Sequence, residues 1–148
     1  METLSKKSAW EVAAIFDYLE TANVPVRVAV LDGDYPLICS LWYEMKDQSL
    51  ICVSHKNSTI AKLLQREKRC AFEVASNHPP YKGVRGKADV TVVDEEVESK
   101  LHRLIVRYLG SSNHSLAHWL LSRSEDELAF VLEPQWLTSW DYSNRMTR

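Results

Sequence analysis

The stretch VRVAVLDGDYP, residues 26–36, decides the fold class of this sequence. Its valines recur at every second position and alternate with Arg27 and Ala29, which is the pattern of a strand with one buried face. The Asp32-Gly33 step that follows is a strong signal for a tight hairpin turn. A return strand is predicted over Leu37–Met45, and a third strand over Ser49–Ser54 follows after a short turn. We therefore predict three antiparallel strands in sequence, which form a meander.

Further along the chain, helical and extended periods alternate. Ser8 and Glu11 have the spacing of a capping box, so a helix is predicted to open there. Gly83 and Gly86 interrupt a long extended run, where glycine indicates a bulge, a bend or the close approach of another group to the backbone. The other predicted elements are helices over Val12–Leu19, after Ser58, from near Asp94 to Leu109 and over Leu116–Leu121, and strands over Arg69–Ala75, Tyr81–Val93 and Leu128–Leu132.

These elements indicate a mainly β fold, a six-stranded antiparallel β-barrel with flanking α-helices. A chain of 148 residues, 45% of them hydrophobic, has the usual size for one core, so we predict a single domain over residues 1–148. The formal charge of −2 argues against a general nucleic-acid binder, which normally carries a strong basic excess. The four glycines form neither a G-x-G-x-x-G nor a Walker loop, which excludes the common glycine-loop nucleotide folds.

The cysteines and the N-terminal segment bear on the compartment. No stretch looks like a signal peptide or approaches the roughly 18 apolar residues that a membrane span needs. Cys39, Cys52 and Cys70 are odd in number and widely spaced, and no paired ligands occur at the short spacing of a zinc site. We expect buried reduced thiols, no bound metal, and a cytoplasmic protein with neither a membrane nor a nucleic-acid partner.

One window departs from the near-neutral balance of charge. Between His55 and Lys87, eight basic residues stand against two acidic ones. The basic residues are Lys56, Lys62, Arg66, Lys68, Arg69, Lys82, Arg85 and Lys87, and the acidic ones are Glu67 and Glu73. This composition indicates a surface that attracts anions.

A strand end followed by a helix start opens this window, over Ser54-His55-Lys56-Asn57-Ser58. Unpaired backbone N–H groups at a helix N-terminus, with the positive end of the helix dipole, form a ready anion site. Lys62 lies one turn after Ser58, so both can face the same ligand. Arg27 would be an unusual inward charge unless it pairs with an anion. These residues indicate a phosphate cradle; the alternative is that Ser58 is only a helix cap and that Lys56 and Lys62 are solvated surface lysines.

Several motifs share an order and spacing with a known family. They are the hairpin at residues 26–36 with Ser40-Leu41-Trp42-Tyr43, the segment Ser54–Lys62 with Leu63-Leu64, and Tyr81-Lys82-Gly83-Val84-Arg85-Gly86-Lys87-Ala88. Together they resemble the FMN-binding split-barrel family related to pyridoxamine 5′-phosphate oxidase, whose members carry a strand of the type aromatic-basic-Gly-Val-Arg-Gly-basic-Ala. The resemblance covers residues 8–93 and extends more loosely over the second long helix and Trp140-Asp141. It implies a six-stranded split barrel and a homodimer with two flavins at the subunit interface.

The resemblance also implies roles for particular residues. In the family a basic residue on the first strand, hydroxyls at the end of the third strand and a lysine on the next helix hold the flavin phosphate. These roles fall on Arg27, Ser54, Ser58 and Lys62. The isoalloxazine ring is expected along the second and third strands, near Ser40, Leu41, Trp42 and Val53, with Trp140 reaching across from the partner subunit. Val28, Ala29, His55 and Lys56 complete the predicted cofactor-binding set.

Departures from the family pattern narrow the range of activities that the resemblance implies. The oxidase proper has an Arg-Lys pair after the cradle serine, whereas this chain has Thr59-Ile60, which predicts a lower affinity for phosphate. His55 and Lys56 are candidates to compensate from the loop. No copy of the oxidase's substrate-phosphate residues occurs towards the C-terminus. The chain therefore resembles the general-stress or flavin-reductase-like members and not the oxidase proper.

Two functions are consistent with these expectations. The first is an FMN-dependent oxidoreductase of unknown substrate that passes two electrons from a nicotinamide or small organic donor to an acceptor. The alternative is a carrier or sensor of flavin, deazaflavin F420 or haem that does not turn over.

The histidines leave further alternatives open. His55 or His78 is a candidate axial ligand for haem, and His55 is the first acid–base candidate because imidazole exchanges protons near neutral pH. His114 and His118 share a helix face at i, i+4, but no third ligand accompanies them, which favours a surface pair. No catalytic residue is assigned.

Overall fold

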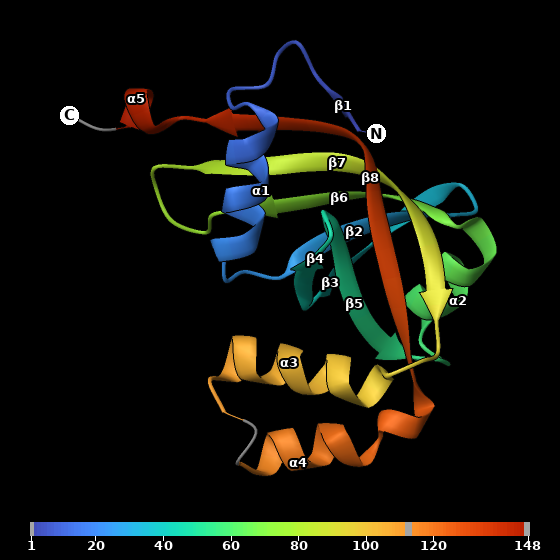
Figure 1. Ribbon diagram of the computed structural model, residues 1–148. Coiled ribbons are helices and arrows are strands. Elements are labelled where there is room, and N and C mark those ends of the chain that lie inside the picture. The colour runs from blue at the N-terminus through green and yellow to red at the C-terminus, as the bar shows by residue number, and fades with distance from the viewer. Residues whose placement is uncertain (1, 112–113, 147–148) are drawn as a thin grey trace.

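The computed structural model describes residues 2–111 and 114–146 of the chain. These residues form one sheet in the order β3-β2-β6-β7-β8-β5-β4, with the short β1 added in parallel to β8 (Figure 1). The strands are β1 (Thr3–Leu4), β2 (Val26–Asp32), β3 (Tyr35–Leu41), β4 (Tyr43–Lys46), β5 (Ser49–His55), β6 (Arg69–Ala75), β7 (Lys82–Val93) and β8 (Glu127–Asp141). The helices are α1 (Val12–Thr21), α2 (Thr59–Glu67), α3 (Val97–Leu109), α4 (Ser115–Ser122) and α5 (Ser143–Met146), and a 3-10 turn, η1 (Ser124–Asp126), precedes β8. The fold is mainly β and antiparallel, as predicted, but the described sheet has eight strands where six were predicted, and it is not a closed barrel.

The hairpin predicted at residues 26–36 is confirmed. β2 and β3 pair from Val26 opposite Leu41 to Asp32 opposite Tyr35, and Gly33 takes the positive φ of 64° in the turn. The strand predicted to run from Leu37 to Met45 is wrong, because the chain leaves β3 at Trp42 and β4 forms on the far edge of the sheet.

The ring of Trp42 accounts for this break between β3 and β4. It stacks on Tyr108 of α3, with ring centroids 5.2 Å apart and an interplanar angle of 6°. The chain is thereby held against α3 at the point where it crosses from one sheet edge to the other. The predicted three-strand meander is therefore wrong, since β4 pairs with β5 and β3 pairs with β2.

β8 is the longest strand, and it extends far beyond the predicted Leu128–Leu132. It runs from Glu127 to Asp141 and continues through Pro134, which pairs with Ala88 of β7. The β7–β8 register shifts between Lys87 and Ala88, so the proline, which has no N–H to donate, sits at an irregularity of the ladder. The aromatic tail predicted after Pro134 is thus a continuation of the sheet.

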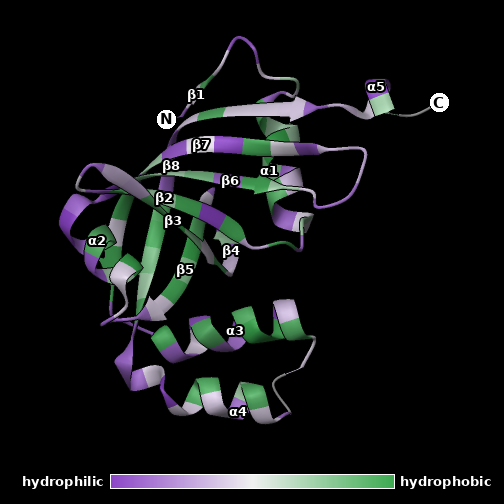
Figure 2. Cartoon of the chain, turned by 180° about the vertical axis from the view of Figure 1, so that it is seen from behind, coloured by the Kyte–Doolittle hydropathy of each residue, from purple (hydrophilic) through white to green (hydrophobic). Residues whose placement is uncertain are grey.

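The main core lies between one face of the sheet and the helices α1 and α2. Figure 2 shows long hydrophobic stretches on β2 and β5, and the side chains of Val26, Val28 and Val30 are buried as the alternation predicts. Helix α2 begins at the predicted cap, because the Ser58 Oγ accepts a hydrogen bond from the Ala61 N–H at 3.2 Å. Its apolar stripe of Ile60, Leu63 and Leu64 is buried in the same core.

The capping box predicted at Ser8 and Glu11 is wrong. Helix α1 begins at Val12, and Glu11 occupies the cap position without a side-chain hydrogen bond. The Ser8 hydroxyl instead donates to the Trp10 carbonyl at 2.8 Å and lies 2.8 Å from the buried Ser139 hydroxyl of β8. A contact across 131 positions of sequence therefore takes the place of the local one.

Helices α3 and α4 form a second, smaller core on the other side of β5 (Figure 1). Helix α3 begins at Val97 and not near Asp94 as predicted, because Glu96 takes a positive φ of 53°, outside the right-handed helical region. Leu101, Ile105 and Ala117 are buried there, and Trp42 and Val53 pack against them. In the described residues no helix is long and apolar enough to cross a bilayer.

Arg107 joins α3 to the C-terminal end of α1. Its guanidinium donates to the carbonyls of Glu20 at 3.1 Å and Ala22 at 2.6 Å, and it lies over the ring of Tyr43 at 5.0 Å. Helix α1 has no basic residue in its own last turn, so Arg107 supplies the positive charge that favours this helix end.

We expect Arg107→Ala to lower the free energy of unfolding by about 2–3 kcal/mol, because several charge-assisted hydrogen bonds to carbonyl groups are lost together. Urea unfolding followed by circular dichroism measures the effect. Arg145→Ala is the matched control, because Arg145 is exposed on α5 and is expected to change the stability little. Equal stability of the two variants would show that Arg107 does not hold the helices together.

Candidate functional site

Two residues of the predicted cradle, Ser54 and Ser58, meet where β5 ends and α2 begins. The hydroxyl oxygens of Ser54 and Ser58 lie 3.0 Å apart, and the Ser58 N–H donates to the His55 carbonyl at 2.9 Å. Because the Ser58 oxygen already accepts from Ala61, its proton is available for Ser54 or for an anion. The N–H groups at the start of α2 point out of the helix into the same region. Two hydroxyls and a helix N-terminus therefore converge as donors.

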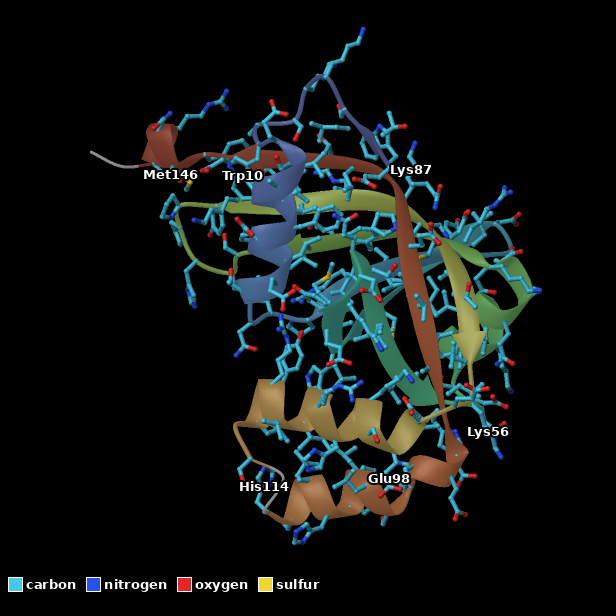
Figure 3. All side chains as sticks on the ribbon, viewed as in Figure 1. Trp10, Lys56, Lys87, Glu98, His114 and Met146 are labelled. Carbon is cyan, nitrogen blue, oxygen red and sulfur yellow. The ribbon has the colours of Figure 1, made fainter. Side chains whose placement is uncertain are left out.

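The two lysines of the cradle differ in their surroundings. Lys56 forms an ion pair with Asp126, with Nζ 3.3 Å from Oδ1, and its backbone N–H donates to the Asp126 carbonyl at 2.8 Å. Figure 3 labels Lys56 beside the connection that leads into β8. Lys62 is exposed one turn into α2. Lys62 is thus the better placed of the two to meet an anion, whereas Lys56 already neutralises a carboxylate.

His55 lies opposite Glu127 in the β5–β8 ladder. The His55 Nδ1 accepts a hydrogen bond from the Asn57 N–H at 3.1 Å, so the neutral ring carries its proton on Nε2. Burial raises the pKa of the Glu127 carboxyl, while the neighbouring His55 and Arg123 side chains oppose that shift. Among the described residues the Glu127 Oε2 is buried without a hydrogen-bond partner.

The raised pKa of Glu127 gives a pH-dependent prediction. Below the pKa that Glu127 has in the unfolded chain, its neutral carboxyl keeps its full favourable contribution to folding. This contribution is lost as the pH rises through the higher pKa of the folded protein, because burying the charged form is disfavoured. We expect Glu127→Gln to raise the free energy of unfolding near neutral pH by up to about 1 kcal/mol, with the gain disappearing below about pH 4.

Urea titrations near neutral pH and below about pH 4 measure this gain in the free energy of unfolding. Glu125→Gln, on the neighbouring exposed side chain, is the control and is expected to change neither titration. A gain for Glu127→Gln that did not vary with pH would contradict the assignment.

Arg27 does not point inward, and that expectation is wrong. Because Val26 and Val28 take the core face, Arg27 lies on the outer face of the sheet, opposite Ser40 of β3 and Glu73 of β6. Its guanidinium donates to the Pro25 carbonyl at 2.8 Å. Helix α2 packs on the core face, so the structure does not bring Arg27 together with the serines of its own chain.

The outer face of the sheet also holds the predicted Trp140. The Arg85 guanidinium lies 4.8 Å from the centre of the Trp140 ring, and the Lys87 ammonium lies 4.9 Å from that of Trp136. Gly83 allows the Trp140 ring to lie directly on the β7 backbone, as the predicted close approach requires. The sequence did not indicate these cation–π pairs, because Trp136 and Trp140 were expected in a tail and not in a strand.

The remaining predicted residues fall into three pairs. Trp42 and Val53 are packed beneath α3 and α4, where they contribute to the smaller core. Ser40 is exposed and Leu41 half-buried on β3. Val28 is fully buried between β3 and β6, and Ala29 lies on the outer face.

The three thiols are buried or half-buried, whereas two of the histidines are exposed. Cys52 and Cys70 are buried and Cys39 is half-buried, and burial raises the pKa of Cys70 to about 12, which keeps it a neutral thiol. In residues 2–111 and 114–146 no group of three or more metal-ligating side chains occurs. His78 and His118 are exposed.

The donor set of the cradle fits a phosphate monoester. Hydroxyls, helix N–H groups and a lysine are the groups that bind phosphate in proteins, and Ser54, Ser58 and Lys62 provide them here. The nearby Asp126 carboxylate is neutralised by Lys56. The residues present therefore suit the phosphate of a flavin mononucleotide.

Several solved structures have a similar architecture. A conserved hypothetical protein, Rv2991 from Mycobacterium tuberculosis, superposes with a TM-score of 0.76 at 19% identity, over 99% of this chain and 94% of its own. A protein described as an F420 reductase gives a TM-score of 0.70 at 15% identity, over 82% of this chain and 94% of its own. An FAD-binding protein from Mesorhizobium loti gives 0.66 at 14% identity, over 88% and 94%.

The fold is the split barrel. It is the fold of the proteins related to pyridoxamine 5′-phosphate oxidase, so the resemblance seen in the sequence is confirmed at the level of the fold. No protein-family model and no curated protein sequence matches the chain.

Proposed function

We propose that this split-barrel protein binds FMN and acts as a flavin-dependent oxidoreductase. The observation that carries the proposal is the pair of hydroxyls, Ser54 and Ser58, held 3.0 Å apart at the open start of α2 with Lys62 one turn beyond. Support comes from the split-barrel fold, which is shared with an F420 reductase and an FAD-binding protein.

In this proposal the residues of the chain bind and orient the cofactor. Ser54, Ser58 and Lys62 hold the phosphate, together with the first N–H groups of α2. The ring extends towards Leu41 on β3, because Trp42 and Val53 are covered by α3 and α4. Ser40 pairs with Arg27 and lies with it on the outer face, so in this account it meets the cofactor of the other subunit. FMN when bound supplies the two-electron chemistry.

The homodimer completes the site in this account. Arg27 and Trp140 lie on the outer face of the sheet, away from the cradle of their own chain. A second subunit packed on that face brings them towards the other cofactor. The physiological electron donor in this account is a nicotinamide or another small organic molecule, and the protein acts in the cytoplasm.

Thr59-Ile60 replaces the basic pair of the oxidase, and Lys56 is engaged by Asp126, so phosphate binding depends mainly on Lys62 and the serines. A flavin-fluorescence titration with FMN tests this, because binding in a folded site quenches the emission. Protein that leaves the fluorescence of FMN unchanged at every ratio would end the proposal.

F420 is the second candidate cofactor, favoured by the structural similarity to an F420 reductase. Parallel titrations with FMN and F420 decide between the two by their dissociation constants. The oxidation of NAD(P)H by the loaded protein then distinguishes an enzyme from a carrier. Oxidation no faster than with the free cofactor would favour a carrier or sensor without turnover.

A further inference from the structure

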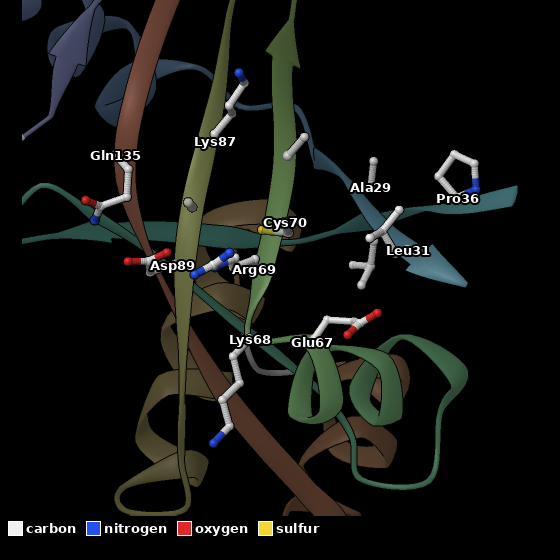
Figure 4. A pocket seen from close by; sticks show the side chains of 13 residues that line it. Ala29, Leu31, Pro36, Glu67, Lys68, Arg69, Cys70, Lys87, Asp89 and Gln135 are labelled. Atoms are coloured by element: carbon white, nitrogen blue, oxygen red, sulfur yellow. The ribbon is translucent and has the colours of Figure 1, made fainter. Parts of the chain in front are cut away.

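A groove of about 920 Å³ lies on the outer face of the sheet, away from the cradle. Ala29 and Ala71, which face one another across β2 and β6, form its floor because their side chains are small. Figure 4 shows Lys68 and Lys87 at opposite ends of the groove with Arg69 between them. The groove therefore combines a shallow apolar floor with three cationic side chains.

The turn between β2 and β3 borders this groove. We call residues 31–36 the hairpin tip; Leu31 and Pro36 at its base also line one side of the groove (Figure 4). Leu31 is 65% exposed and Tyr35 is 81% exposed, and Ile38 next to the tip is 69% exposed. In the part of the chain that the structure describes, these are the three most exposed large apolar side chains. Leu31 and Ile38 lie on the outer face with the groove, and Tyr35, which pairs with Asp32, lies on the other face of the hairpin tip. Exposed apolar side chains concentrated on one hairpin in this way mark an interaction site.

The hairpin tip and the groove have opposite charges. Asp32 and Asp34 are exposed in the tip, and no described residue forms an ion pair with either. Within the groove, Glu67 is paired with Arg66 at 3.6 Å, and Asp89 lies opposite Arg69 in the ladder. Lys68 and Lys87 are left as the cations at its two ends, with no acidic partner within 4.0 Å among the described side chains. The tip thus matches the groove in both apolar surface and charge.

We propose that two copies of this chain associate about a two-fold axis, with the hairpin tip of each inserted into the groove of the other. The tip and the groove are neighbours on one face, so a rotation that seats one tip in the partner's groove seats the other tip in the first groove as well. Such a reciprocal contact is what a closed dimer requires. The inference rests on the homodimer of the proposed function and names the contact that holds it.

A charge-swap experiment tests the contact by sedimentation of the full chain. The tip variant is Asp32→Lys/Asp34→Lys, and the groove variant is Lys68→Glu/Lys87→Glu. Each variant alone places like charges at both contacts, so its dimer dissociation constant is expected to rise by about 10-fold or more over that of the unaltered chain. In an equal mixture every tip meets a groove of opposite charge, and the two variants are expected to form a heterodimer. All four positions are exposed, and circular dichroism verifies that the variants are folded.

Asp17→Lys on the exposed surface of α1 is the matched control, and its dissociation constant is expected to be unchanged. Tyr35→Ser tests the apolar part of the contact and is expected to weaken the dimer as well. A chain that stays monomeric at all concentrations, reversals that leave the dissociation constant unmoved, or folded variants that do not associate when mixed would each overturn the contact. FMN titration of the same samples tests the cofactor proposal separately. If the charge reversals break the dimer but the protein never binds flavin, the dimer contact is supported and the cofactor proposal is wrong.

Discussion

Replacing Lys62 by alanine is expected to weaken FMN binding by about 1–3 kcal/mol, which corresponds to about 5–150-fold in the dissociation constant. Lys62 is exposed on α2, one turn after the Ser58 cap, and it supplies the positive charge for the phosphate in this account. Ser54→Ala is expected to weaken binding in the same direction, because a hydroxyl donor is lost while the cap of α2 stays intact. Isothermal titration calorimetry with FMN measures both effects.

Arg66→Ala is the matched control on the same helix. The Arg66 guanidinium donates to the Leu31 carbonyl at 3.1 Å, outside the cradle, so its removal is expected to leave the FMN affinity unchanged. Arg27→Ala tests whether the cofactor reaches the outer face of the sheet. Arg27 lies on that face, so its removal can weaken binding only of a cofactor that extends there. If Lys62→Ala and Ser54→Ala both bound FMN as tightly as the unaltered chain, the phosphate would not lie at the start of α2.

Gly86→Ala is expected to lower the free energy of unfolding by about 1–3 kcal/mol through overpacking. A Cβ at this position would lie 2.4 Å from the Phe72 ring and 3.1 Å from the Trp136 carbonyl oxygen. Phe72 is buried in the main core, and the Trp136 carbonyl belongs to the paired strand β8, so neither can move far. Urea unfolding followed by tryptophan fluorescence measures the loss.

A double-mutant cycle with Phe72→Leu isolates the cause. The smaller side chain leaves room for the new methyl group, so the two changes together are expected to destabilise the protein by less than their sum. Strict additivity of the two changes, or a Gly86→Ala variant as stable as the unaltered chain, would contradict the role assigned to this glycine.

Local patterns in the sequence predicted the elements whose causes are local. The alternation over Val26–Val30 identifies the buried face of β2, and the Asp32-Gly33 turn identifies its pairing with β3. The cap at Ser58 was predictable because its hydrogen bond joins residues three positions apart. The cradle of Ser54 and Ser58 follows from the same segment, since both hydroxyls lie within five residues of one another.

Long-range contacts account for the errors. Trp42 ends a run that looks like one continuous strand because it stacks on Tyr108, a residue of a distant helix. Ser8 has a capping-box spacing, but its hydroxyl lies 2.8 Å from the Ser139 hydroxyl of β8 and does not cap α1. β8 continues past Pro134 because the register shift beside Ala88 accommodates a residue without an N–H.

Within the site, the direction of the Arg27 side chain likewise depends on long-range packing that the sequence does not show. The alternation shows that Arg27 and Val28 lie on opposite faces, but not that the face of Arg27 is turned away from α2. Membership of the cradle depends on where α2 packs, which is a property of the whole sheet. Lys56 has the right position in the sequence as well, yet Asp126 engages it from a segment some 70 residues away.

The visible absorption spectrum of the protein, recorded after incubation with FMN and removal of the free flavin, shows whether the chain binds FMN. We expect the two visible-range bands of oxidised flavin to stay with the protein, and the Lys62→Ala variant to retain less of the colour under the same treatment. A protein that emerges colourless, or that carries the spectrum of haem and takes up no flavin, would contradict this expectation.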